Sequence, residues 1–271
     1  MSKYRRRLMM QEKKVIKPYM HIEALEDNLT VSFSPSLSTN AIEYSLDGST
    51  WVTLPADTAS PAIKAGRKIY FRGELKSDDD YSQVYGIGTF VISKRCNVGG
   101  NVMSLLFSDD FENHYSLENH EYSFYNLFNG CTSLVSVSEN FLPATTLSNY
   151  CYGNMFRNCT SLISAPSLPA TTLSSHCYTY MFLNCTSLVK APDLLAETLI
   201  QYCYYYMFYG CSSLNYIKAM FTTTITAYFN QLTSGWVGGV ASTGTFVKNK
   251  DATWNVTGEN GIPSGWTVIT E

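Results

Sequence analysis

The sequence predicts an α+β protein: a short solenoid in which each 26-residue repeat supplies one strand and one short helix, preceded by a small β-sandwich. Near-identical copies of one unit, a spacing of four between apolar residues within each copy, and short alternating segments before the first copy support this fold class. The composition fits a folded chain, because 45% of the 271 residues are hydrophobic and 14% aromatic. Disordered chains, by contrast, are rich in charge and poor in aromatic residues.

Residues 1–20 form a basic N-terminal arm, in which residues 1–17 carry seven basic side chains and one acidic one. Such an arm could contact nucleic acid, an anionic membrane or an acidic protein surface, or it could be a solvated terminus. Polar residues rather than an apolar core follow the basic stretch, so no export signal is expected. We expect the arm to anchor the protein in an assembly through Arg5, Arg6, Arg7, Lys13 and Lys14.

Residues 21–98 have the pattern of a small β-sandwich of the fibronectin or immunoglobulin type. Short segments that alternate apolar and polar residues end at turn signals. Asp47 and Gly48 separate two such segments and predict a hairpin, since both residue types accept a positive φ. The expected strands lie within residues 21–33, 41–46, 51–54, 68–72 and 87–93.

Residues 99–211 contain the repeats. Residues 159–184, CTSLISAPSLPATTLSSHCYTYMFLN, match residues 185–210, CTSLVKAPDLLAETLIQYCYYYMFYG, at 15 of 26 positions without a gap. A third copy, residues 131–158, precedes them with two extra residues, and incomplete copies begin at Tyr122 and Cys211. A single copy cannot bury its own apolar sides, so the copies are expected to stack.

Each copy is predicted to contain a short helix. In the first complete copy, Leu147, Cys151 and Met155 recur at every fourth position, a spacing typical of a helical stripe. Threonines precede the stripe as candidate N-caps, at Thr146, Thr172 and Thr198. Each predicted helix ends at a residue type that tolerates the left-handed conformation, namely Gly130, Asn158, Asn184 and Gly210.

A short apolar segment after the first cysteine of each copy is predicted to be a strand, over residues 134–137, 162–165, 188–191 and 214–217. Stacking would align two buried rows, Leu134, Leu162, Leu188 and Leu214 in one and Phe128, Phe156, Phe182 and Phe208 in the other. Residues 212–271 are expected to supply the last coil and a C-terminal cap, with a helix over residues 221–232. The candidate covering residues of that cap are Trp236, Trp254 and Trp266.

The strings LPATTLSNYCYGNMFRNCTSLISAP and LPATTLSSHCYTYMFLNCTSLVKAP resemble the BspA-like class of leucine-rich repeats, over about residues 100–235. The closing segment GIPSGWTVITE also looks like the C-terminal end of such proteins. These repeats occur on surface proteins of gut and oral bacteria and in related phage proteins. The resemblance implies a non-catalytic role in adhesion or recognition, without naming a ligand.

Tyrosine gives the clearest candidate for a binding surface. Two columns recur through the copies, Tyr152, Tyr178 and Tyr204 in one and Tyr180 and Tyr206 in the other. A row that faces water would form a platform for sugar rings or a protein partner, because tyrosine combines rigid apolar area with a polar tip. A row that faces the core would be packing only.

The eight cysteines do not have the spacing of a metal site, since they recur at intervals of 8 and 26 residues rather than as C-x₂₋₄-C pairs. Disulfides such as Cys151–Cys159 are conceivable. Their repeat-equivalent, apolar-flanked positions favour reduced cysteines packed as small hydrophobic side chains. No nucleophile elbow, phosphate-binding loop or zinc-protease motif occurs, and the four histidines are scattered, so an enzyme is not expected.

We therefore expect a non-catalytic protein whose repeat block binds a glycan or protein ligand on a cell surface. The basic arm and the expected lack of an export signal favour a phage virion protein of the tail or capsid. A secreted or surface-anchored bacterial adhesin is an alternative, as is a structural protein whose repeats pack against identical copies or other virion proteins. No cofactor, metal or membrane span is expected, and nucleic acid is not the expected ligand.

Overall fold

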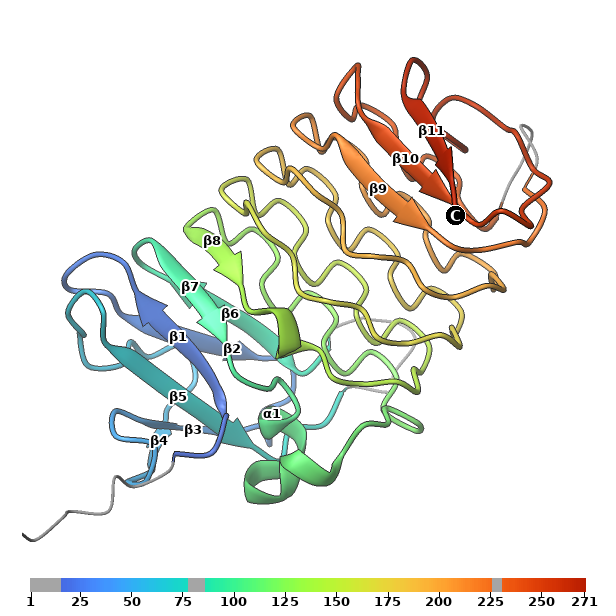
Figure 1. The fold of residues 1–271 in the computed structure, drawn as a ribbon. Coiled ribbons are helices and arrows are strands. Elements are labelled where there is room, and N and C mark those ends of the chain that lie inside the picture. The colour runs from blue at the N-terminus through green and yellow to red at the C-terminus, as the bar shows by residue number, and fades with distance from the viewer. Residues whose placement is uncertain (1–15, 78–85, 226–230) are drawn as a thin grey trace, which may run out of the picture.

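A computed structural model describes residues 16–77, 86–225 and 231–271 of the chain. The predicted anchoring residues Arg5, Arg6, Arg7, Lys13 and Lys14 lie outside these described residues. Strands gather at the two ends of the molecule, and the repeat copies follow one another between them (Figure 1).

The N-terminal strands form one large sheet and one small one. The large sheet has the order β4-β3-β5-β1-β7-β8, and β2 pairs with β6 in the small sheet. The bounds are β1 Met20–Ala24, β2 Val31–Pro35, β3 Ile42–Ser45, β4 Val52–Leu54, β5 Lys68–Gly73, β6 Gly88–Ile92, β7 Cys96–Gly99 and β8 Leu134–Val137. Buried and half-buried residues alternate along β1 and β5, as expected for strands with one face on the core.

The predicted hairpin is confirmed: β3 and β4 pair antiparallel around Asp47 and Gly48. Oδ1 of Asp47 accepts hydrogen bonds from the backbone amides of Ser49 and Thr50, both at 2.7 Å. Gly48 has a φ of 69°, which a residue without a side chain adopts at little cost. These hydrogen bonds hold the pKa of the Asp47 carboxyl well below its usual value, because they stabilise the charged form.

The small sheet packs on the large one through aromatic rings. The Phe90 ring on β6 lies 4.9 Å from that of Phe33 on β2 and 5.1 Å from that of Phe71 on β5, measured between centroids. The large sheet continues into the repeats, since β7 pairs in parallel with β8. The N-terminal strands therefore share their largest sheet with the first repeat copy.

The predicted fold class, an α+β solenoid preceded by a small β-sandwich, is wrong, because the regular elements of the described residues are mostly strands in mixed sheets, with one short α-helix, α1 (Ser104–Phe107). That helix precedes the complete repeat copies and is followed by the 3₁₀ turn Ser108–Asn113; a second 3₁₀ turn covers Glu139–Phe141. A solenoid with a helix in every repeat is not what the chain forms. The described part of the helix expected over residues 221–232 is also not helical.

A run of tight turns replaces the predicted helix in each copy. Every second backbone amide from residue 150 to residue 158 donates to a carbonyl of the next copy, as in Tyr152 to Cys177 at 3.1 Å. The amides between them donate three residues back along the chain, as in Met155 to Tyr152 at 3.3 Å. An α-helix would instead satisfy all of its interior amides within itself.

The positive φ angles explain why no helix forms. In each copy every fourth residue is left-handed: Tyr150, Asn154 and Asn158, then His176, Tyr180 and Asn184, then Tyr202, Tyr206 and Gly210. A left-handed residue interrupts a right-handed helix. The sequence prediction of left-handed Gly130, Asn158, Asn184 and Gly210 is confirmed, with φ values of 76°, 59°, 60° and 75°. Each of these residues is the last of several left-handed residues in its copy and does not end a helix.

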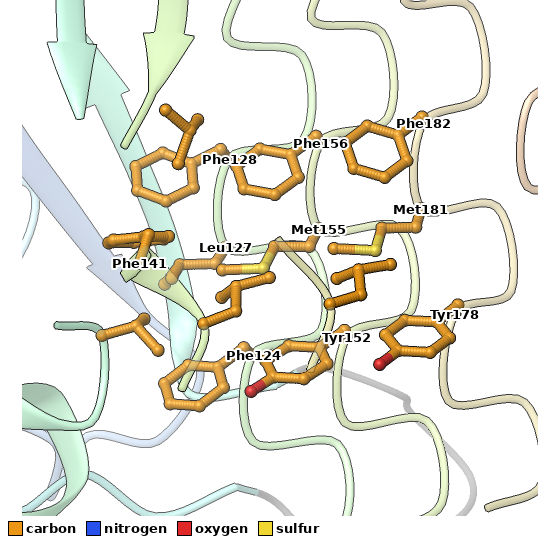
Figure 2. Packing of buried hydrophobic residues seen from close by; sticks show 14 of the residues in the cluster. Phe124, Leu127, Phe128, Phe141, Tyr152, Met155, Phe156, Tyr178, Met181 and Phe182 are labelled. Carbon is orange, nitrogen blue, oxygen red and sulfur yellow. The ribbon is translucent and has the colours of Figure 1, made fainter. Parts of the chain in front are cut away.

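The core consists of rows of identical or similar side chains from successive copies (Figure 2). Phe128, Phe156, Phe182 and Phe208 stack at centroid distances of 5.7, 5.5 and 5.7 Å, which confirms the predicted phenylalanine row. Leu127, Met155 and Met181 form a second row beside it. The predicted leucines Leu134, Leu162, Leu188 and Leu214 are all fully buried.

The four predicted strands of the repeats are only partly formed. Leu134–Val137 is strand β8, whereas residues 162–165 and 188–191 make single bridges, from Ser136 to Ser164 and from Ser164 to Lys190. The fourth is displaced by two residues to β9 (Tyr216–Ala219). β9 pairs in parallel with β10 (Thr245–Lys248), and β10 with β11 (Thr267–Thr270). The buried tryptophans of this C-terminal end are Trp236, Trp254 and Trp266.

Candidate functional site

The runs of tight turns, which we call turn runs, place tyrosine side chains in rows, and the rows differ in how deeply they are buried. The column of Tyr152, Tyr178 and Tyr204 lies in the core, with exposed fractions of 1%, 2% and 1%. Their rings stack at centroid distances of 6.0 and 6.1 Å. Burial raises the pKa of all three hydroxyls well above the usual value. The structure therefore assigns these three predicted binding residues to packing.

The other two predicted residues, Tyr180 and Tyr206, are half-buried and contact each other at a centroid distance of 5.6 Å. Tyr205 lies beside both, 5.3 Å from Tyr180 and 4.7 Å from Tyr206. Burial, reinforced by a hydrogen bond with the Tyr205 side chain, raises the pKa of Tyr180 to about 12. This hydroxyl therefore stays neutral and can both donate and accept a hydrogen bond.

Residues that the sequence prediction missed extend this cluster. Tyr150, His176 and Tyr202 form one more half-buried row, with centroid distances of 4.1 and 4.5 Å between successive rings. Their spacing of 26 residues was the available signal, but the histidine interrupts the tyrosine column. At the next turn Tyr209 is 40% exposed and lies 5.2 Å from Tyr206.

We call these residues together the tyrosine surface: Tyr150, His176, Tyr180, Tyr202, Tyr205, Tyr206 and Tyr209. Its rings are held in place by neighbouring backbone. A Cβ atom added to Gly235 would lie 2.8 Å from the Tyr206 ring, and one added to Gly238 would lie 2.6 Å from the Tyr209 ring. These two rings therefore rest directly on the backbone of the following turn run.

A cation borders the tyrosine surface. The guanidinium carbon of Arg157 lies 5.7 Å from the centroid of the Tyr180 ring, within the range of a cation–π contact. Nε of Arg157 is buried and has no hydrogen-bond partner. Positive charge is thus placed beside the Tyr180 ring.

A groove lies over the strand segments and their proline-containing turns. It has a volume of about 610 Å³ and its walls include Ile163, Pro166, Val189, Pro192 and Leu195, which we call the proline groove. Ile163, Val189 and Leu195 are 51%, 42% and 41% exposed. The ammonium group of Lys190 at its edge lies 3.8 Å from a carboxyl oxygen of Asp193. The groove is mainly apolar and holds an ion pair rather than a free charge at that edge.

Cysteines and acidic residues offer few groups for other chemistry. All eight cysteines are free and buried. Within residues 16–77, 86–225 and 231–271, no three histidine, cysteine or acidic side chains are grouped so as to hold a metal ion. No helix among these residues is long and apolar enough to cross a membrane.

The tyrosine surface is the strongest candidate for a binding site, because its rings are packed on one another and on neighbouring backbone and its side chains offer suitable chemistry. Its hydroxyl groups and the adjacent arginine can donate and accept hydrogen bonds, and its rings supply apolar area. Comparison of the chain with protein-family models, with curated proteins and with solved structures returns no match.

Proposed function

We propose that this protein is a non-catalytic recognition module that binds a glycan or protein ligand on a cell surface through the tyrosine surface. One observation supports the proposal above the others: seven neighbouring aromatic side chains remain partly exposed while being packed on one another. Tyrosine is the side chain that binding surfaces use for rigid, amphipathic contact area at low entropic cost.

Preorganisation is the physical advantage of this arrangement. A ligand that binds flexible side chains must offset about 0.5–1.5 kcal/mol for each one that it immobilises. On the tyrosine surface the rings are already fixed by stacking, as in Tyr150 against His176 at 4.1 Å, and by backbone contact, as in Tyr206 against Gly235. More of the contact energy is therefore available as affinity.

The stacking also limits how a ligand can be held. Neighbouring rings cover one another's faces in the row of Tyr150, His176 and Tyr202. The ring edges and hydroxyls are then the parts that a ligand would meet. Such an array favours partners rich in hydrogen-bonding groups, either sugar hydroxyls or peptide backbone.

The proposal includes no chemical step. The surface contains one imidazole ring, that of His176, which lies between the rings of Tyr150 and Tyr202. Its Nδ1 shares a hydrogen bond of 2.8 Å with the Ser175 hydroxyl, and burial lowers its pKa. A ring held in this way serves packing and hydrogen bonding.

The binding test compares two triple variants of the full chain. Tyr202→Ser, Tyr205→Ser and Tyr209→Ser alter the tyrosine surface, while Ile163→Ser, Val189→Ser and Leu195→Ser alter the proline groove as a matched control. Labelled proteins are applied to an array of bacterial surface polysaccharides and to intact bacterial cells. We expect the tyrosine variant to bind at least about tenfold more weakly, because central interface tyrosines each contribute roughly 2 kcal/mol. Equal loss in both variants, or no binding by the wild type, would contradict the proposal.

A purely structural role is the second candidate, and one observation favours it. Strand β11 lies at the end of the order β11-β10-β9, and its Val268 and Ile269 are 45% and 48% exposed. An exposed edge strand can pair with another chain. Mass photometry separates the candidates: a stable homo-oligomer that Val268→Lys dissociates would favour structure, and a monomer would favour recognition.

Location in a phage virion stays a prediction from the sequence, as do its alternatives at a bacterial surface. Mass spectrometry of purified particles tests the prediction directly. The protein is expected among the tail or capsid components at a constant ratio to them, and its recovery only from cell envelopes would favour the adhesin.

A further inference from the structure

Cysteines repeat along one column of the copies, and all but the first are engaged in the same way. Their thiols donate to a phenylalanine carbonyl of the preceding copy: Cys159 to Phe128 at 3.1 Å, Cys185 to Phe156 at 3.0 Å and Cys211 to Phe182 at 3.0 Å. Each of these cysteines is fully buried. Burial raises the pKa of all three thiols, so they stay protonated.

Cys131 begins this column and has different surroundings. The neighbouring strand on its outer side is β7, whose first residue is Cys96. The amide of Cys96 donates to the carbonyl of Ser133 at 3.0 Å, and Cys96 pairs with Leu134 in the sheet register. This backbone pairing places Cys96 beside the turn that begins at Cys131, and each of the two thiols shifts the pKa of the other.

The surroundings of the Cys131 sulfur are partly polar, since the hydroxyl of Ser133 lies 3.4 Å from it. The Cys96 thiol, followed by the Ser133 hydroxyl, lowers the pKa of Cys131 against the opposing effect of burial. The Cys131 thiol and burial raise the pKa of Cys96. Of the two thiols, that of Cys131 therefore ionises more readily.

We propose that Cys96 and Cys131 are an oxidisable pair, in which Cys131 reacts first with a hydroperoxide and Cys96 then closes a disulfide between β7 and the first repeat copy. Cys131 is the more accessible of the two, with 7% of its surface exposed against 0% for Cys96. This site is separate from the tyrosine surface and does not depend on the proposed binding function.

The chemistry takes two displacement steps. The Cys131 thiolate attacks one oxygen of the hydroperoxide, so that an S–O bond forms, the O–O bond breaks and the departing oxygen takes up a proton. The sulfur of Cys96 then attacks the sulfur of the resulting sulfenic acid. An S–S bond forms, the S–O bond breaks and the oxygen leaves as water with the proton of Cys96. Two thiols are oxidised to one disulfide while hydrogen peroxide is reduced to two waters.

The test treats the reduced full chain with hydrogen peroxide, blocks remaining thiols with iodoacetamide and maps the digested protein by mass spectrometry. We expect the loss of two hydrogen atoms and a cross-linked peptide pair containing Cys96 and Cys131. The other six cysteines should be alkylated once the protein is unfolded. A disulfide at another pair, or none while the protein stays folded, overturns the proposal.

Two variants separate the roles. Cys96→Ser should leave a sulfenic acid on Cys131 that a dimedone probe labels, while the matched variant Cys159→Ser should form the Cys96–Cys131 bond as the wild type does. A time course of iodoacetamide on the folded wild type needs no variant. Cys131 should react at least about tenfold faster than Cys159, because a thiolate is the reactive form of cysteine. Equal rates would refute the assignment of Cys131 as the first to react.

Discussion

At the scale of single residues, the tyrosines differ in what surrounds their hydroxyl groups. The sequence predicts that Tyr152, Tyr178 and Tyr204 share a column, and in the structure their rings stack in one row. The spacing cannot show which side of the chain faces the core. In each run of tight turns, left-handed residues rather than helical geometry set the direction of the side chains. Tyr180 and Tyr206 reach the surface, whereas the first column fills the core.

Tyr152 has a buried hydroxyl without a hydrogen-bond partner, and the preceding ring in its row is Phe124, at 5.7 Å. An unsatisfied buried hydroxyl costs about 1–3 kcal/mol. Tyr152→Phe should therefore raise the free energy of unfolding by about 1 kcal/mol, measured by urea denaturation. Tyr150→Phe, at a half-buried position, is the control and should change stability little. A loss of stability in Tyr152→Phe would show that its hydroxyl has a partner in solution.

An ion-pair network joins β3, β5 and the turn after α1. Arg72 donates to Glu43 at 2.7 Å and to both carboxyl oxygens of Asp109 at 2.8 and 2.7 Å. The hydroxyl of Tyr19 and then Arg72 hold the pKa of Asp109 below its usual value. Asp109 thus stabilises the fold above the usual carboxyl pKa, and that contribution is lost as the pH falls through its lowered pKa.

Substitution of Asp109 tests this pH dependence. The gap in melting temperature between the wild type and Asp109→Asn should be largest above about pH 5 and should shrink below about pH 3. Glu118→Gln, at an exposed position, is the control. A gap that stays constant from neutral to acidic pH would contradict this account of Asp109.

At the scale of elements, the turn run is the part that sequence analysis assigned wrongly. Leu147, Cys151 and Met155 recur at every fourth position, and both a helix and a chain of four-residue turns place such residues on one side. The distinguishing signal is the left-handed residue at each fourth position. Asn154 and Asn158 suggest it, but tyrosines occupy the positions equivalent to Asn154, at Tyr180 and Tyr206, and conceal it.

Asn158 tests the importance of the left-handed positions. It has a φ of 59°, and its side-chain oxygen accepts a hydrogen bond from Asn184 at 3.0 Å. Asn158→Ala should lower the free energy of unfolding by about 1–2 kcal/mol, because alanine is strained in this conformation. Asn158→Gly should cost less, since only the side-chain bond is lost. Urea midpoints provide the measurement, and equal costs would show that backbone strain is not the cause.

At the scale of the whole molecule, the copies behave as interchangeable layers. The amide of Asn158 donates to Leu183 and that of Asn184 donates to Tyr209, so each copy presents the same bonding pattern to the next. The repeat period and the buried phenylalanine row were predictable for this reason. The continuation of the N-terminal sheet through β7 into β8 was not, because the two pairing segments share no sequence pattern.

Removal of one layer tests this equivalence. Deletion of residues 159–184 should give a folded protein with cooperative but less stable unfolding, since one copy and one interface are lost. Deletion of residues 159–180 is the control, because it breaks the period and should prevent folding. Near-ultraviolet circular dichroism and thermal unfolding report both results. Equal behaviour of the two proteins would contradict the layered organisation.

The buried ring row has an optical consequence. Tyr152, Tyr178 and Tyr204 follow one another at 6.0 and 6.1 Å, and Trp236 completes the row 6.1 Å from Tyr204. Light absorbed by any of these phenols can pass by resonance to the indole, whose excited state is lower in energy. The row therefore passes excitation energy from its tyrosines to Trp236. Tryptophan fluorescence excited through tyrosine then reports whether the layers are assembled.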